Sequence, residues 1–133
     1  MVTGIGYNGF IVSAYPYDKK GGNMIKIKIQ LDFNNGPIWG NYYDEDTNVI
    51  KTGIDLIDNN DSIQELNKEI QNKYSSYYEF NSHDQACWFN EEKEKNEKEE
   101  MLALLNKLIE EISSVNDGSF EIEDNETERI KKL

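Results

Sequence analysis

The sequence predicts an α+β domain in which an antiparallel β-meander, formed by the N-terminal half, packs against two main helices, with a short C-terminal strand. Two kinds of periodicity lead to this prediction. Apolar residues alternate with polar ones through much of the first half, and after residue 60 they recur at steps of three and four. At 133 residues, the chain is long enough for a single domain, 1–133, and too short for two of ordinary size.

The strands of the expected meander are recognised by their apolar residues. An aromatic-rich stretch at 7–17 fits a short strand that stops near Pro16. Residues 25–33 alternate strictly between apolar and polar side chains, which predicts one buried and one solvent-facing side. Residues 38–43 follow as an antiparallel neighbour, and apolar residues return at 49–57. Turn signals rich in Gly, Asn and Asp separate these stretches, at 19–23, 34–37 and 44–48.

Two later stretches have helical periodicity. A capping box that begins at Ser62 predicts a helix from there to about residue 74, with one apolar stripe facing the sheet. A longer helix is expected at 91–115, where a charged first half, with a favourable Glu94–Lys98 pair, precedes an apolar stripe. After a turn at 116–118, alternation predicts the last strand around residues 120–122, and residues 126–133 are expected to form a frayed terminal turn.

An aromatic and polar segment at 77–90 separates the two helices. Its aromatic residues, with one just before it, are Tyr74, Tyr77, Tyr78, Phe80, Trp88 and Phe89. Segments between helices usually favour small polar residues, so these side chains either pack the centre of a small core or form a recognition surface. Exposure of Tyr77, Tyr78 and Trp88 would favour recognition, because Tyr and Trp recur as interface hot spots.

The chain is strongly acidic, with 26 Asp and Glu against 14 Lys and Arg and a net charge of −12. This balance opposes direct binding to nucleic acid, which requires clustered basic residues, and favours a cationic partner. Negative charge that merely maintains solubility is the alternative. The single cysteine, Cys87, fits a reducing compartment, and the N-terminus has no signal-peptide or membrane-span pattern, so we expect a cytoplasmic protein.

The reactive side chains do not form a recognisable catalytic or metal motif. His83, Asp84 and Cys87 lack an accompanying oxyanion-hole pattern, and one His with one Cys is too few for a zinc site. The loop 44–48 begins like a calcium loop, but Val49 stands where the motif needs Gly. We therefore expect a binding protein and no enzyme, metal or cofactor. A small hydrolase or transferase that uses His83 with a carboxylate, or an acidic mimic of nucleic acid, remains the alternative.

Three segments of the sequence resemble a known family. They are GPIWGNYYDEDTNVIKTGIDLID, YSSYYEFNSHDQACWFNEEKEKNEKEEMLALLNKLIEEI and NDGSFEIEDNETERIKKL. In their order they resemble immunity proteins of bacterial contact-dependent inhibition and related polymorphic toxin systems, particularly those paired with ribonuclease toxins. The resemblance covers about residues 24–133, and residues 1–23 lie outside it, as a variable N-terminal strand or leader would.

The resemblance implies a one-to-one complex with a cognate toxin, a basic nuclease, and no membrane contact. We expect acidic side chains to imitate the phosphates that the toxin's Lys and Arg hold, while aromatic anchors slow dissociation. The family gives no residue-level contacts for this chain, so the candidate surface is chosen on charge and aromatic character. It consists of Asp44, Glu45, Asp46, Asp55, Asp58, Asp61, Tyr78, Glu79, Asp84 and Trp88.

Overall fold

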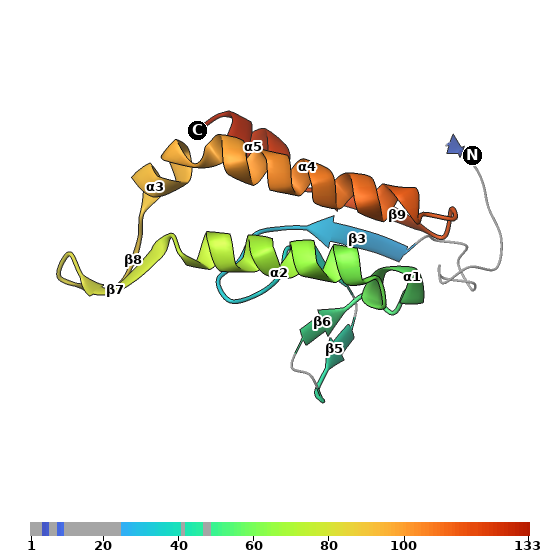
Figure 1. Ribbon diagram of the computed structural model, residues 1–133, viewed down its shortest axis with the longest axis horizontal. Helices are drawn as coiled ribbons and strands as arrows, with labels where there is room; N and C mark the ends of the chain where they lie inside the picture. Colours follow the sequence, from blue (N-terminus) through green and yellow to red (C-terminus); the bar gives the residue numbers. More distant parts are fainter. Residues whose placement is uncertain (1–3, 6–7, 10–24, 41, 47–48) are drawn as a thin grey trace.

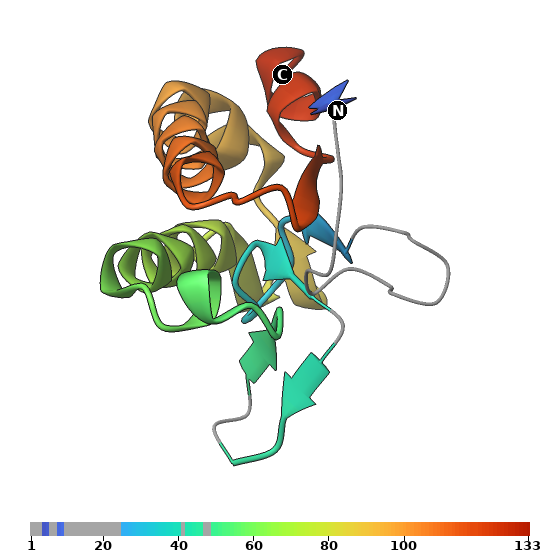
Figure 2. The same ribbon diagram turned by 90° about the vertical axis from the view of Figure 1, so that its right-hand side faces the viewer.

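A computed structural model describes residues 4–5, 8–9, 25–40, 42–46 and 49–133. Two long helices, α2 (Asp61–Ser75) and α4 (Lys98–Ser114), lie beside one another and cover one face of the central strands (Figures 1 and 2). Helices and strands both contribute to the described residues, and antiparallel pairs lie in the N-terminal half. The α+β prediction is therefore confirmed.

The central sheet has three strands in the order β4-β3-β9. Strand β3 (Ile25–Ile29) pairs antiparallel with β4 (Ile38–Trp39), as expected for the chain reversal at 34–37. On its other side β3 pairs in parallel with β9 (Phe120–Asp124), the predicted last strand. A parallel pair needs a long crossover connection, which is supplied here by the helices between β4 and β9.

The remaining strands form separate two-stranded sheets. They are β1 (Gly4–Ile5) with β2 (Asn8–Gly9), β5 (Tyr42–Asp44) with β6 (Val49–Lys51), and β7 (Tyr78–Ser82) with β8 (Gln85–Phe89). The second half of the predicted strand 38–43 thus belongs to the β5–β6 hairpin and not to the central sheet. Most of the predicted strand at 7–17 lies outside the described residues.

Helix α2 begins one residue earlier than the capping box predicts. Its cap is Asn60, whose side-chain oxygen accepts the amide of Ile63 at 3.0 Å. The hydroxyl of Ser62 instead binds the carboxylate of Glu111 on α4. Asn is as good a cap as Ser, so the residue two positions earlier captures the first free amide.

The expected helix at 91–115 is two helices, α3 (Glu91–Asn96) and α4, separated at Glu97. The predicted Glu94–Lys98 pair does not form, because Lys98 donates to the carbonyl of Leu133 at 2.9 Å and Glu94 binds Arg129. Pairs four residues apart contribute only about 0.2–0.5 kcal/mol, so these tertiary contacts prevail over a straight helix. Lys73 of α2 binds Glu97 at 2.9 Å and holds the junction.

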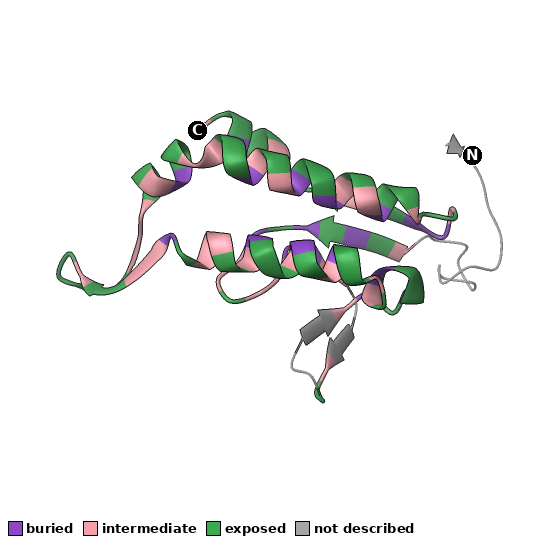
Figure 3. Cartoon of the chain, in the orientation of Figure 1, coloured by how far each residue is buried: buried purple, intermediate pink, exposed green. Residues whose placement is uncertain are grey.

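The hydrophobic core lies between the two long helices and the inner face of the sheet (Figure 3). Ile27 and Ile29 from β3, Ile63 and Ile70 from α2, and Leu105 from α4 are all fully buried. The predicted stripes therefore face inward. The meander expected at 49–57 ends with β6, because residues 55–58 form helix α1 (Asp55–Asp58), which adds buried Ile57 beside the start of α2.

The last residues are not frayed. They form helix α5 (Thr127–Lys131), whose Ile130 is 0% exposed. Arg129 on this helix joins two buried carboxylates, Glu94 and Glu126, and Glu126 also accepts the amide of Leu31 at 2.9 Å. Burial of one apolar side chain and a charged cluster that reaches α3 and Leu31, just after β3, hold this short helix in place.

Candidate functional site

The aromatic segment 77–90 contains a β-hairpin that extends beyond the adjacent ends of α2 and α3 (Figure 1). We name β7, β8 and their turn the arm. Its turn is the two residues His83 and Asp84, with φ of 52° and 57°. Positive φ at both central residues defines the type I′ turn, whose twist matches that of antiparallel strands. These strands are not predicted from the sequence, because His-Asp is not one of the usual type I′ dipeptides.

The base of the arm is packed among aromatic rings. Tyr78 lies 5.0 Å from Phe33 and 4.9 Å from Phe89 between ring centroids, and Tyr74 contacts the same cluster. Tyr77 is 0% exposed, and burial raises the pKa of its hydroxyl to about 12. Of the three side chains whose exposure would favour recognition, Tyr77 is buried and Tyr78 and Trp88 are half-buried, so none is fully exposed and the base of the arm belongs to the core.

The outer part of the arm exposes an apolar face. Phe80 is 53% exposed, and its partner across the hairpin, Cys87, is also exposed. Only Leu56, at 51%, is a comparably exposed large hydrophobic side chain in the described parts of the chain. Phe33 touches the inner edge of Phe80, with ring centroids 5.4 Å apart. This apolar face was not among the residues chosen from the sequence, because exposure of a single Phe leaves no local sequence signal.

The opposite face of the arm is polar and aromatic. His83 stacks on Trp88 with ring centroids 3.7 Å apart. Glu79 accepts the side-chain amide of Asn90 at 2.9 Å, and its other oxygen lies 3.8 Å from Nδ1 of His83. Successive strand residues point to opposite sides, so Trp88 and its stacked His83 lie on the face away from Cys87. His83 and Cys87 therefore do not face one another as a base and a thiol.

The acidic candidates fall into two groups. Asp58 accepts three hydrogen bonds, from the amide and hydroxyl of Thr52 and from the amide of Gly53, at 2.9–3.1 Å. Asp44 pairs with Lys51 at 2.9 Å and is only 15% exposed, so both carboxylates serve the local fold. The exposed members are Glu45, Asp46, Asp55, Asp61 and Asp84. These five carboxylates are accessible to a cationic partner.

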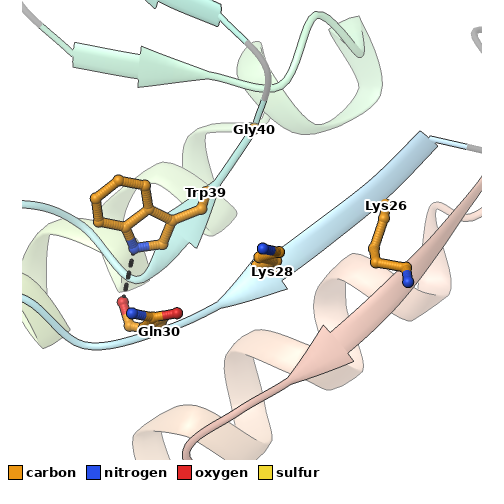
Figure 4. A pocket seen from close by; sticks show the side chains of 5 residues that line it. All are labelled: Lys26, Lys28, Gln30, Trp39 and Gly40. Atoms are coloured by element: carbon orange, nitrogen blue, oxygen red, sulfur yellow. Dashed lines mark hydrogen bonds between the residues drawn. The ribbon is translucent and has the colours of Figure 1, made fainter.

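A shallow pocket of about 250 Å³ lies on the outer face of the central sheet (Figure 4). Trp39 and Lys28 are cross-strand partners, and the Trp39 indole donates to the carbonyl of Gln30 at 2.9 Å. Lys26 lies 3.5 Å from Glu123 and 3.7 Å from Glu121, so the surroundings of the pocket are close to charge-balanced. This arrangement supplies no concentrated charge for an anion or a cation.

Two further properties concern the described residues alone. They contain no group of three or more His, Cys, Asp or Glu side chains placed to hold a metal ion. None of their helices has both the length and the apolar character needed to cross a bilayer.

Comparisons with protein-family models, with curated proteins and with solved structures found no match for this chain. Its function must therefore be inferred from its own residues and their geometry.

Proposed function

We propose that this chain is an immunity protein that acts in the cytoplasm, where it binds and neutralises a cognate toxin, a basic nuclease of the ribonuclease type. The complex is one-to-one, and the chain works by covering the toxin's substrate-binding surface. No turnover, cofactor or metal is required of it. The observation that carries the proposal is the arm, which presents exposed Phe80 on a firmly anchored hairpin within an acidic molecule.

The arm combines rigidity with apolar exposure. Its base is fixed by Tyr77 and the surrounding rings, so little conformational entropy is lost when its tip is bound. Fully burying an aromatic side chain contributes about 1.5–3 kcal/mol, and for Phe80, which is 53% exposed, about half of this remains to be gained. A partner that covers Phe80 gains this energy, which is characteristic of an interface hot spot.

The exposed carboxylates supply the attraction to a basic surface. Asp84 lies at the turn of the arm, and Glu45, Asp46, Asp55 and Asp61 lie on the segments around β5, β6 and α1. Nuclease surfaces that hold phosphates carry Lys and Arg, and acidic side chains compete for the same positions. Complementary charge speeds association, whereas the aromatic contact slows dissociation.

Co-expression tests the proposal. The chain is produced with the toxin-like reading frame directly upstream of its gene, and the mass of the complex and the integrity of cellular RNA and DNA are measured. We expect a one-to-one complex with intact nucleic acids, and degradation when this chain is omitted. Absence of both complex and protection contradicts the proposal.

His83→Ala separates this proposal from the hydrolase or transferase alternative, which the 3.8 Å approach of Glu79 to His83 favours. An inhibitor retains protection in this variant and shows no turnover to lose. An acidic mimic of nucleic acid, in contrast, inhibits several unrelated nucleic-acid enzymes, whereas an immunity protein recognises one toxin lineage.

A further inference from the structure

Strand β8 (Gln85–Phe89) lies at the edge of a sheet that has only two strands. An edge strand presents unpaired backbone amides and carbonyls, and proteins usually protect such edges with charged residues, Pro, bulges or a covering segment. The residues of β8 are Gln85, Ala86, Cys87, Trp88 and Phe89. It therefore has neither a charge nor a proline along its length.

This neutrality is unusual within the same molecule. Every other described strand of three or more residues carries at least one charged side chain: Lys26 in β3, Asp44 in β5, Lys51 in β6, Glu79 in β7 and Glu121 in β9. Charged residues make up 30% of the whole chain. An unprotected edge in such a polar chain is where a pairing partner is expected.

The rest of the molecule supports the outer part of the arm through β7, whereas β8 is held at its base, where Phe89 packs against Tyr74 and Tyr77. Phe33 contacts Tyr78 and Phe80, both on β7, with ring centroids 5.0 and 5.4 Å apart. The first three residues of β8, in contrast, are all exposed, and Trp88 stacks on His83 of the same hairpin. Beyond the aromatic rings that hold its base, the outer arm is a two-stranded hairpin, and a strand added to β8 would stabilise it further.

The charges at the two ends of β8 indicate which partner fits. Asp84 precedes the strand, and Glu91 and Glu92 follow it closely; all three are exposed. Helix α3 also carries Lys93, which donates to the carbonyl of Ser76 at 3.4 Å, and exposed Lys95, so the charge at this end of β8 is only weakly negative. A strand laid along β8 therefore meets a neutral centre, with Asp84 at one end and a weakly negative end at the other. A second copy of this chain would bring another −12 charges to the same place, which opposes self-pairing.

We propose that a segment of the cationic partner in β conformation pairs with β8 through main-chain hydrogen bonds and adds a third strand to the arm. Basic side chains at the ends of that segment lie near Asp84 and near Glu91 and Glu92. An apolar side chain on one of its faces continues the surface of Phe80 and Cys87. This inference rests on the proposed function and identifies how the toxin is held.

The test uses the complex of the full chain with the toxin domain encoded directly upstream. Ala86→Lys places a positive charge at the centre of the free edge, and Ala103→Lys places the same charge on another exposed alanine, on α4. We expect Ala86→Lys to weaken binding by about tenfold or more, and Ala103→Lys by less than about threefold. Equal effects of the two substitutions overturn the inference, because they would report net charge alone.

Amide hydrogen exchange provides a second measurement that does not depend on the variants. In the complex, we expect outward-facing amides of residues 85–89 to exchange at least about tenfold more slowly than in the free chain. An intact, protective complex without this slowing overturns strand addition and leaves the proposed function in place. Failure to form any complex overturns both. If exchange at residues 85–89 slows as the concentration of the isolated chain rises, the added strand comes from a second copy of this chain, and the proposal of a cationic partner is wrong.

Discussion

Replacing Arg129 with methionine tests the charged cluster that fixes α5 to the rest of the fold. Nε of Arg129 donates to Glu126 at 2.7 Å, and Nη2 donates to Glu94 at 2.8 Å. Burial alone would lower the pKa of Arg129, but the hydrogen bonds with Glu94 and Glu126 outweigh burial and raise the pKa above its ordinary value, so the guanidinium stays charged. Glu94 and Glu126 are only 4% and 6% exposed. The variant therefore buries two carboxylates without a cation.

The expected cost follows from the exposure of each partner. Removing one member of a buried ion pair typically costs about 3–5 kcal/mol. The Arg129 side chain is 42% exposed, so water reaches part of the cluster and reduces the penalty. We expect Arg129→Met to lower the free energy of unfolding by about 2–4 kcal/mol. This is a large fraction of the roughly 5–15 kcal/mol that stabilises a typical domain.

Urea denaturation measures this loss, and the same helix offers a matched control. Lys131 pairs with Glu128 at 3.3 Å, with side chains 57% and 77% exposed, so Lys131→Met should cost less than about 0.5 kcal/mol. Adding Glu94→Gln and Glu126→Gln to Arg129→Met removes the unpaired charges and should restore much of the stability. If Arg129→Met costs no more than Lys131→Met, the cluster does not stabilise the fold as described.

The further predictions concern three side chains, Tyr77, Asp58 and Asn60. The buried hydroxyl of Tyr77 has no hydrogen-bond partner within the described residues, so Tyr77→Phe should not lower the melting temperature; a clear loss would show that the hydroxyl is bonded. Because burial raises the pKa of Tyr77 to about 12, its hydroxyl ionises at lower pH in the unfolded chain than in the folded one. The stability that neutral Tyr77 contributes is therefore complete below pH ~10 and lost as the pH rises to about 12. In ultraviolet titration, wild type should show one tyrosine that ionises near pH ~12, and Tyr77→Phe should lack it. Asp58→Ala should cost about 2–3 kcal/mol in urea denaturation and the exposed Asp55→Ala less than about 0.5, since three hydrogen bonds end on Asp58; equal costs would contradict its structural role. Asn60→Ala should lower the free energy of unfolding by about 1 kcal/mol through loss of the α2 cap. An unchanged urea midpoint would show that Asn60 does not stabilise the start of α2.

The parts of the fold that follow from local patterns were predictable. Alternation along residues 25–29 places Ile27 and Ile29 in the core, and the apolar stripe of α2 buries Ile63 and Ile70. Both patterns depend only on neighbouring residues and on the period of the backbone. The last strand was also predicted from alternation, but its parallel pairing with β3 was not, because the paired residues are 95 positions apart.

The candidate surface was harder to predict for the same reason. Asp58 looks like any surface acid until Thr52 and Gly53 are folded back onto it. The type I′ turn at His83 and Asp84 lacks the usual Gly, so the arm was not recognised, and with it the exposure of Phe80 was missed. Net charge favours a cationic partner, which stays a prediction, whereas the position of the contact depends on which side chains tertiary packing leaves exposed.

The affinity of two matched variants for the upstream-encoded toxin domain tests the central proposal most directly. Phe80 and Leu56 are 53% and 51% exposed, and only Phe80 lies on the arm. We expect Phe80→Ser to raise the Kd by about tenfold, which corresponds to about 1.4 kcal/mol, and Leu56→Ser by less than about threefold. Equal, small changes in both variants, with both chains folded, would contradict the arm as the toxin-binding element.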